Sequence, residues 1–380
     1  MKFLYENEHI PSELVPHISD NKSLHPYFEN SFNGVKPKNT CGFLSIDGES
    51  YFIVPKIIGE ENAGETNLDI FIYMLLYAYD VQLKNEDLQQ GRSAEDRLFE
   101  VFIRMFADGL LDELKRGVFK QYITLQENLR VLRGKYLIEK NFANFYHQNL
   151  YCEFDEFSMD NTLNRFFLYA LRTFQKVSNY PNLHRCEAML DEVSFFNVDL
   201  KRLHLQFDRM NSRYEKSYEI ARMIMDHLVP LTGKSGNRSF AFLFDMAEVF
   251  EKFVARLFKE IDTTTKVQHQ KNFGSLQLKP DIVTDSLIID TKYKSVSSRD
   301  ELATHDKYQM FAYGTNFKQT NVLLLYPKHH VDVKEDLVLG RGDDEIYLKM
   351  RSLDLGYNGG YEGFGDEMRN RIVEVICGGR

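Results

Sequence analysis

The chain has 380 residues, of which 43% are hydrophobic and 13% are aromatic. This composition supports two or three ordinary globular cores and excludes an intrinsically disordered protein. The formal net charge of −9 excludes a molecule that attracts nucleic acid over its whole surface, so any DNA contact needs a local basic surface or a partner.

Targeting and cysteine patterns point to an intracellular location. Met1 to Leu4 is followed at once by Glu6 and Glu8, which leaves no apolar signal region. The longest apolar run, residues 70–79, is too short to span a bilayer. The four cysteines lack the paired spacing of a zinc site or a disulfide framework: Cys41, Cys152, Cys186 and Cys377. We therefore expect a cytoplasmic protein that makes no membrane contact.

Residues 1–66 are expected to form a small β-rich N-terminal domain. Segments 43–46 and 51–54 have strand composition and flank Asp47-Gly48. An Asp-Gly pair suits the positive backbone angles of a tight turn, so these segments predict a β-hairpin.

Residues 67–230 are expected to form a mainly helical middle region. Segment 68–81 is apolar nearly all round, which predicts a helix buried between other elements. Ser93 and Asp96 form a capping pattern before a helix over 97–115, which Gly117 ends. Strands are predicted at 118–125 and 151–157, and Asp160 is placed to cap a helix over 162–175.

Segment 278–294, LKPDIVTDSLIIDTKYK, has charged residues where strands usually have Val or Ile. Side chains alternate along a strand, so Asp290 and Lys292 should project from the same face. The turn residues 284–286 should fold the second strand back beside the first and bring Asp281 close to Asp290.

Two nearby carboxylates repel each other unless a cation lies between them, and oxygen ligands suit Mg²⁺ or Mn²⁺. A neighbouring lysine can hold or activate a water molecule, and the metal can stabilise charge on a phosphate. The pattern thus outlines a phosphodiesterase centre. The alternative is a solvated ion pair, because short Asp-x-Lys sequences are frequent on surface strands.

A helix predicted over 240–259 precedes this segment. Glu251 lies within its apolar stripe, where a carboxylate needs a partner; the stripe consists of Phe244, Ala247, Val254 and Phe258. Glu248, near the opposite face, is the second candidate. The alternative for either residue is a helix-edge glutamate that reaches solvent.

A second helix, predicted over 299–317, follows the segment. Gln309 and Tyr313 lie one turn apart on one face of this helix. The plainer interpretation is a polar helix edge with a core tyrosine. Residues 321–327, NVLLLYP, are predicted to form the next buried strand of the same sheet.

The spacing Pro-Asp, eight residues, Asp-x-Lys resembles the signature of the PD-(D/E)xK nuclease superfamily, and Gln309 with Tyr313 resembles an element of its RecB-like members. The resemblance implies that Asp281, Asp290 and Glu251 bind the metal. It also implies that Lys292 positions or activates water and that Gln309 belongs to the catalytic centre. The expected fold class is mixed α/β, with residues 231–380 forming a restriction-endonuclease-like domain in which helices flank a central mixed sheet.

A narrower resemblance rests on three segments in fixed order before the nuclease motif. The apolar helix 70–79, the Arg133-Gly134-Lys135 turn and the segment FSMDNTLNR at 157–165 are similar to the McrC family, over roughly residues 40 to 330. McrC proteins are nuclease subunits of McrBC methylcytosine-dependent restriction systems. The resemblance implies an endonuclease that cleaves DNA containing modified cytosine together with an McrB-like AAA+ ring. The ring, not this chain, would use GTP, and residues 67–230 would bind it.

Two other interpretations remain open at this stage. The chain could be a non-catalytic scaffold that stimulates the GTPase ring, or an unrelated α/β protein with an ion-paired strand. Gly233-Lys234-Ser235 resembles the end of a phosphate-binding loop, but Leu228 stands where its first glycine is needed, so nucleotide hydrolysis by this chain is not expected. His329, His330 and the glycine-rich segment 356–365 are expected to lie in surface loops.

Overall fold

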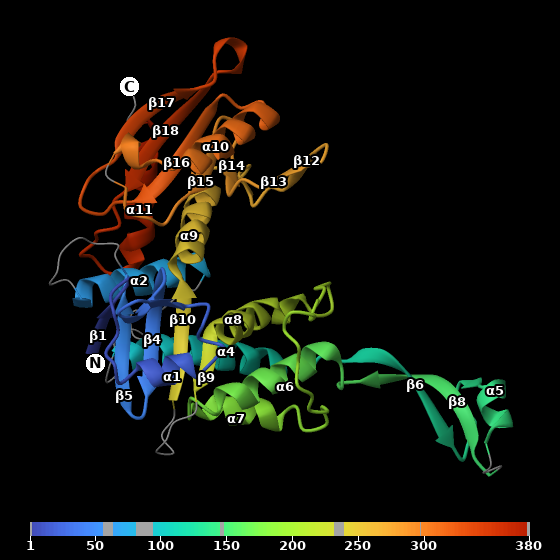
Figure 1. Ribbon diagram of the computed structural model, residues 1–380. Helices are drawn as coiled ribbons and strands as arrows, with labels where there is room; N and C mark the ends of the chain where they lie inside the picture. The colour runs from blue at the N-terminus through green and yellow to red at the C-terminus, as the bar shows by residue number, and fades with distance from the viewer. Residues whose placement is uncertain are drawn as a thin grey trace. The chain divides into compact units, whose positions relative to one another are not determined.

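A computed structural model describes residues 2–55, 64–80, 94–144, 148–231, 239–296 and 298–377. The chain divides into two compact units (Figure 1). The first unit contains Met1–Leu98 and His227–Arg380, and the second, here called the inserted unit, contains Phe99–Asp226. The division into domains 1–66, 67–230 and 231–380 stays a prediction.

A five-stranded sheet in the first unit combines strands from both of its chain segments. Its order is β1-β5-β4-β10-β9. Strand β10 lies antiparallel to β4, with Phe242 opposite Phe43. The bounds are β1 Lys2–Tyr5, β4 Thr40–Ile46, β5 Glu49–Val54, β9 Leu228–Leu231 and β10 Ser239–Asp245. A strand of the predicted C-terminal domain therefore completes the sheet of the N-terminal region.

The predicted hairpin over 43–54 is confirmed. Asp47 and Gly48 have φ of 51° and 89° and join β4 to β5. The helix α1, Val15–Ser19, and the hairpin of β2, Phe28–Ser31, with β3, Gly34–Pro37, precede them. The Gly233-Lys234-Ser235 segment lies outside the described residues.

The helix predicted over 240–259 is wrong in its first six residues. Residues 240–245 belong to β10, and α9, Met246–Ile261, begins after them. The physical reason is that this apolar segment pairs with β4 on one side and β9 on the other, which makes it an interior strand of a buried sheet. Asp245 caps α9 by accepting a hydrogen bond from the Ala247 N–H at 2.8 Å.

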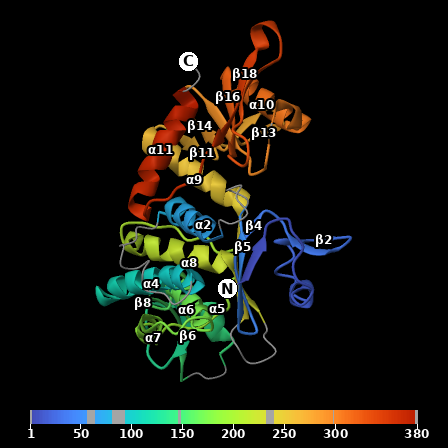
Figure 2. The same cartoon turned by 90° about the vertical axis from the view of Figure 1, so that its left-hand side faces the viewer.

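Three helices of the first unit pack against one another through aromatic rings, and both ribbon views show them side by side (Figures 1 and 2). They are α2, Gly64–Ala78; α9; and α11, Tyr361–Cys377. The Phe253 ring lies 5.4 Å from Tyr77 and 5.7 Å from Phe364, centroid to centroid. The buried helix predicted over 68–81 is thereby confirmed as far as Ala78, while Val81 lies outside the described residues.

The surface loop predicted over 356–365 is wrong in its second half, because α11 begins at Tyr361. Gly365 lies within this helix, and a Cβ there would stand 2.7 Å from the Tyr77 ring. The glycine thus allows close helix packing rather than chain flexibility. His329 and His330 do lie in the loop after β16, as predicted.

A six-stranded mixed sheet forms the rest of the first unit, in the order β11-β14-β15-β16-β18-β17. β15, β16 and β18 run parallel, and the other neighbours pair antiparallel. The bounds are β11 Lys266–Val267, β14 Ile282–Val283, β15 Ile288–Thr291, β16 Asn321–Pro327, β17 Lys334–Leu339 and β18 Ile346–Leu353; a separate hairpin joins β12 Lys271–Phe273 to β13 Leu276–Leu278. The predicted strand 321–327 and the predicted mixed α/β fold class are confirmed.

Helix α10, Thr304–Phe317, packs on this sheet. It begins five residues later than predicted, because Arg299–Glu301 forms a short 3₁₀ helix instead. Its side chains Met310 and Tyr313 join a buried apolar cluster with Ile288, Val322, Leu324 and Leu348. This cluster fixes the helix against β15 and its neighbours, where the candidate residues lie.

The inserted unit is mainly helical with one three-stranded antiparallel sheet, β6-β8-β7. Its bounds are α4 Ala94–Lys115, which starts at the end of the first unit, β6 Gln121–Leu129, β7 Lys135–Tyr136, α5 Ile138–Phe142, β8 Leu150–Ser158, α6 Thr162–Phe174, α7 Pro181–Ala188, a 3₁₀ helix Ser212–Tyr214 and α8 Glu215–His227. The predicted strands and helices exist here with shifted ends. Among all helices described, none has the length and apolarity needed to cross a membrane.

The cap of α6 differs from the prediction by one residue. Asn161, not Asp160, accepts the hydrogen bond from the Asn164 N–H, at 3.1 Å. Asp160 instead forms a bidentate pair with Arg165, at 2.6 and 2.9 Å, which lowers the pKa of Asp160 to about 2. Asn161 directly precedes the first helical residue, and from there its side chain reaches the free N–H groups of the first turn. Ser93, the other predicted cap, lies outside the described residues.

Gly42 offers a test of the β4–β10 pairing. Its φ is +136°, and a Cβ there would lie 2.1 Å from the Phe242 carbonyl oxygen. We predict that Gly42→Ala lowers the free energy of unfolding by more than about 2 kcal/mol, because it adds a backbone clash to an unfavourable φ. Urea denaturation followed by circular dichroism measures this, since the chain has no tryptophan.

Gly274→Ala is the matched control for this substitution. Gly274 also has a positive φ, +62°, but a Cβ added there would have no other atom within 4 Å. Gly274→Ala should lower the free energy of unfolding by only about 1 kcal/mol. Equal losses in the two variants would contradict the close approach of β10 to Gly42.

Candidate active site

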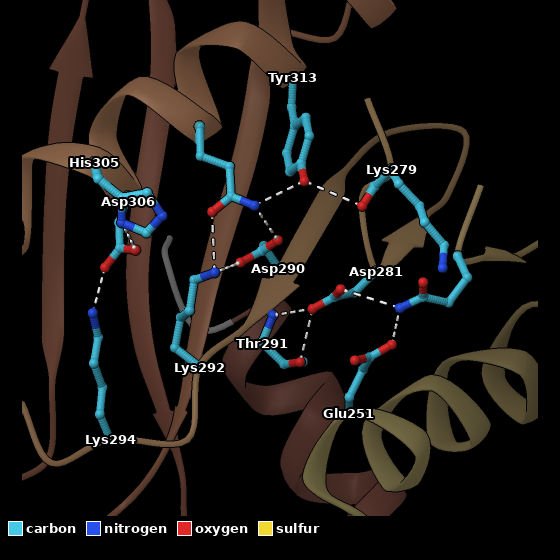
Figure 3. Close-up of polar contacts among 12 residues, drawn as sticks. Glu251, Lys279, Asp281, Asp290, Thr291, Lys292, Lys294, His305, Asp306 and Tyr313 are labelled. Carbon is cyan, nitrogen blue, oxygen red and sulfur yellow. Dashed lines mark hydrogen bonds and ion pairs between the residues drawn. The ribbon is translucent and has the colours of Figure 1, made fainter. Parts of the chain in front are cut away.

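The turn between β14 and β15 brings the two aspartates of the motif together. Thr284 N donates to the Leu287 carbonyl at 2.9 Å, and Ile282 lies opposite Ile289 in the antiparallel pair. Asp281, just before β14, accepts hydrogen bonds from Thr291 N at 2.8 Å and from Thr291 Oγ1 at 2.9 Å (Figure 3). The Asp281 carboxylate is thereby fixed beside the strand that carries Asp290.

Asp290 is a carboxylate almost completely removed from water, with 2% of the residue exposed. Its Oδ2 lies 2.6 Å from Lys292 Nζ, so the two residues project together as predicted. From the described residues, however, Oδ2 receives no hydrogen bond of regular geometry. Burial, followed by the charge of Asp281, raises the pKa of Asp290 to about 7, although Lys292 acts in the opposite direction.

Helix α10 contributes Gln309 and Tyr313 to this centre. Lys292 Nζ donates to Gln309 Oε1 at 3.0 Å, and Gln309 Nε2 lies 3.4 Å from Asp290 Oδ1. Gln309 Nε2 also donates to the Tyr313 hydroxyl at 2.8 Å, and that hydroxyl donates to the Lys279 carbonyl at 3.2 Å. Gln309 therefore contacts both members of the Asp290–Lys292 pair.

Glu251 on α9 faces the same centre from the other side, as Figure 3 shows. The Gln268 amide nitrogen donates to Glu251 Oε1 and lies 3.4 Å from Asp281 Oδ1. Burial and the charge of Asp281 raise the pKa of Glu251. Glu248 instead pairs with Lys252 at 2.7 Å with its side chain 49% exposed, so of the two glutamates only Glu251 is linked to Asp281.

Two residues of this arrangement, Gln268 and Asp306, were not predicted from the sequence. Gln268 lies outside every motif, and only the pairing of β11 with β14 brings it to Asp281. Asp306, 1% exposed on α10, pairs with Lys294 and lies 3.1 Å from His305 Nδ1. A signal for Asp306 existed, because Asp306, Gln309 and Tyr313 recur at helical spacing on one face.

The donor set fits a hard divalent cation. In the described part of the chain, no three or more His, Cys, Asp and Glu side chains already stand as a complete ligand group. Yet Asp281 raises the pKa of both Glu251 and Asp290, which means that the carboxylates are close enough to repel, and Asp290 Oδ2 is buried without a regular hydrogen bond. Mg²⁺ and Mn²⁺ are bound by such oxygen ligands. The catalytic and metal-binding roles of these residues stay predictions.

Known proteins share the family and the fold of this chain. A family model described as "McrBC 5-methylcytosine restriction system component" matches residues 35–327. No curated protein matches the chain. A chain in the refined half-complex from a tetradecameric assembly of Thermococcus gammatolerans McrB AAA+ hexamers with bound McrC is similar at 20% identity and TM-score 0.57, over 98% of this chain and 99% of that chain. This likeness shows a shared fold. A chain in the cryo-EM structure of the Thermococcus gammatolerans McrBC complex matches at 23% identity and TM-score 0.47, over 68% of this chain and 86% of that chain.

The raised pKa of Asp290 leads to a prediction for the metal-free protein. The folded chain keeps a proton on Asp290 that the unfolded chain releases above the usual pKa of 3.8. Stability from this group is therefore present below pH 4 and is lost as the pH rises to about 7. We predict that Asp290→Asn, measured in EDTA, gains roughly 2–4 kcal/mol over the native chain between pH 4 and pH 8.

Thermal unfolding at several pH values measures this difference. Asp262→Asn is the control, because hydrogen bonds from Thr264 lower the pKa of the exposed Asp262 carboxyl. That variant should show no such gain at higher pH. If Asp290→Asn and the native chain have the same pH dependence, the Asp290 carboxyl is not destabilised by its surroundings.

Proposed function

Because the chain belongs to the family of McrBC 5-methylcytosine restriction system components, we propose that it is the metal-dependent endodeoxyribonuclease subunit of a McrBC-like, modification-dependent restriction complex. The buried Asp290, paired with Lys292 at 2.6 Å beside Asp281, is the observation that carries this proposal. A structural ion pair gains nothing from a second carboxylate that weakens it. A metal-dependent phosphodiesterase centre, in contrast, needs more than one carboxylate to bind its cation.

In this proposal Asp281, Asp290 and Glu251 hold Mg²⁺ or Mn²⁺. When bound, the cation supplies positive charge that stabilises the phosphate during cleavage. Lys292 holds the attacking water near the phosphate with its ammonium group, and Gln309 orients that group through its Oε1 at 3.0 Å. Thr291 fixes Asp281 by two hydrogen bonds and so keeps one metal-binding carboxylate in place.

We further propose that the chain binds an McrB-like AAA+ ring that uses GTP and delivers DNA containing modified cytosine. The negative net charge of −9 supports delivery by a partner, because this chain as a whole does not attract the phosphate backbone. The fold likeness to a chain from an assembly of McrB AAA+ hexamers with bound McrC is in keeping with it.

The partner contact is assigned to residues 67–230, and within them to the β6-β8-β7 sheet of the inserted unit. Tyr122 and Phe157 lie directly opposite each other on β6 and β8, with ring centroids 5.0 Å apart. They are 69% and 51% exposed. Other exposed apolar residues lie between β6 and β7, on β7 and on α5: Val131, Leu132, Tyr136, Ile138 and Phe142. An apolar surface of this kind is typical of a protein interface.

Substitution of the candidate catalytic residues tests the nuclease assignment. We predict that Asp281→Ala, Asp290→Ala and Lys292→Ala each abolish DNA cleavage by the complex reconstituted with its GTPase. Each removes a metal ligand or the charge that holds the water. Gln309→Ala should slow cleavage less, because it only orients other groups. The measurement compares cleavage of modified DNA with GTP turnover in the same reaction.

GTP turnover and ring assembly should stay at the level of the native complex in all four variants. Cleavage by Asp290→Ala at the native rate would contradict the nuclease centre, whereas GTPase stimulation without cleavage by the native complex would favour the non-catalytic scaffold. Loss of GTPase stimulation together with cleavage would contradict the separation of the nuclease centre from the partner surface.

The partner surface is tested by the double substitution Tyr122→Ser with Phe157→Ser. We predict at least a tenfold loss of affinity for the ring, because exposed aromatic side chains that become buried at an interface contribute strongly to binding. Size-exclusion co-elution and fluorescence titration measure it. Phe32→Ser, at a fully exposed phenylalanine in the β2–β3 turn, is the control and should leave binding unchanged. Native affinity in the double variant would place the contact elsewhere.

A further inference from the structure

Gln268 occupies an unusual backbone position directly after β11. Its φ is +50°, in the left-handed region that residues other than glycine seldom adopt. Its backbone N–H donates to the Asp281 carbonyl at 2.7 Å, which ties the residue to one of the candidate metal ligands. Such a backbone conformation persists where the surrounding structure holds it, and it is most frequent at functional sites.

The side chain of Gln268 lies between two carboxylates. Its amide nitrogen donates to Glu251 Oε1 and lies 3.4 Å from Asp281 Oδ1. One neutral group thus joins two acidic side chains, one from α9 and one from the residue just before β14. The Gln268 amide group therefore lies where a cation bound by both Glu251 and Asp281 would lie.

We propose that Gln268 is a further metal ligand, whose amide oxygen joins Asp281 and Glu251 around the divalent cation. The inference rests on the proposed function. A half-turn about the last side-chain torsion exchanges the amide nitrogen and oxygen while the rest of the residue stays in place. The oxygen is a hard neutral ligand of the kind that Mg²⁺ and Mn²⁺ accept. The same side chain therefore reduces repulsion without metal and binds the metal when it is present.

The choice of an amide over a carboxylate has a physical reason. A glutamate at position 268 would place another negative charge beside Glu251 and Asp281, since the Gln268 amide contacts both carboxylates. Glutamine keeps an oxygen ligand at this position and avoids that repulsion in the metal-free chain. A leucine would have similar volume but neither the donor nor the oxygen.

Metal binding by the full-length chain tests this inference independently of cleavage. After treatment with EDTA and dialysis, Mn²⁺ is titrated into the native chain and into Gln268→Leu, Gln268→Glu and Gln277→Leu, with binding followed by calorimetry and by the electron paramagnetic resonance signal of free Mn²⁺. We expect Gln268→Leu to weaken binding at least tenfold and Gln268→Glu to bind as tightly as the native chain or more tightly. Gln277, exposed on β13, provides the matched control, and its leucine variant should bind normally.

Each outcome decides a separate point. Native Mn²⁺ affinity in Gln268→Leu overturns the role of Gln268 and leaves the proposed nuclease centre standing. Absence of Mn²⁺ binding by the native chain overturns both. If Gln268→Leu does not fold, Gln268→Glu decides, because weaker binding in that variant rules out an oxygen ligand at position 268.

Discussion

The burial of the Asp290 carboxylate next to Asp281 is the constraint on which the candidate site depends. A charge removed from water is costly unless an opposite charge or hydrogen bonds replace the water. Here Lys292 supplies the opposite charge from two residues along the strand, and Asp281 lies close enough to work against it. Lys292 offsets only part of the cost, since the pKa of the Asp290 carboxyl is still raised to about 7. A divalent cation would offset the rest.

Helix α10 contacts the end of β15 and the residues that follow it through a row of polar side chains. Asp306, Gln309 and Tyr313 lie on one face of the helix and contact, in order, Lys294, the Asp290–Lys292 pair and the Lys279 carbonyl. The Asp306–Lys294 pair is buried on the acid side, with 1% of the Asp306 side chain exposed. Buried pairs of this kind add little net stability, but breaking one leaves a charge without a partner. Here the Asp306–Lys294 pair helps to fix the position of α10 along β15, which places Gln309 beside Lys292.

How far the sequence could predict this site depended on how local each contact is. The turn at 284–286 and the alternation of strand side chains are local, so the proximity of Asp281, Asp290 and Lys292 followed from the sequence. The helical period alone predicted that Gln309 and Tyr313 share one face of a helix. The contact of Gln309 with Lys292 depends in addition on the packing of α10 beside β15. Gln268 could not be found in this way, because it reaches Asp281 through the pairing of β11 with β14, and nothing in its neighbours along the chain marks it.

The incorrect predictions have the same cause. Segment 240–245 has an apolar composition that suits a helix or a buried strand, and its partner strand β4 lies far away in the sequence. Glycines at 356–365 indicate a loop by local rules, but Gly365 serves the close contact of α11 with Tyr77. In both places tertiary packing outweighed local preference.

The pairing of β4 with β10 has a consequence for synthesis of the protein on the ribosome. Phe43 pairs with Phe242, about 200 residues later, so the complete sheet cannot form until that strand has been made. The inserted unit is complete in sequence by Asp226, before β10, the second neighbour of β4, has been made. Contacts this distant along the chain close slowly. The sheet of the first unit can therefore be completed only after the whole inserted unit has been synthesised.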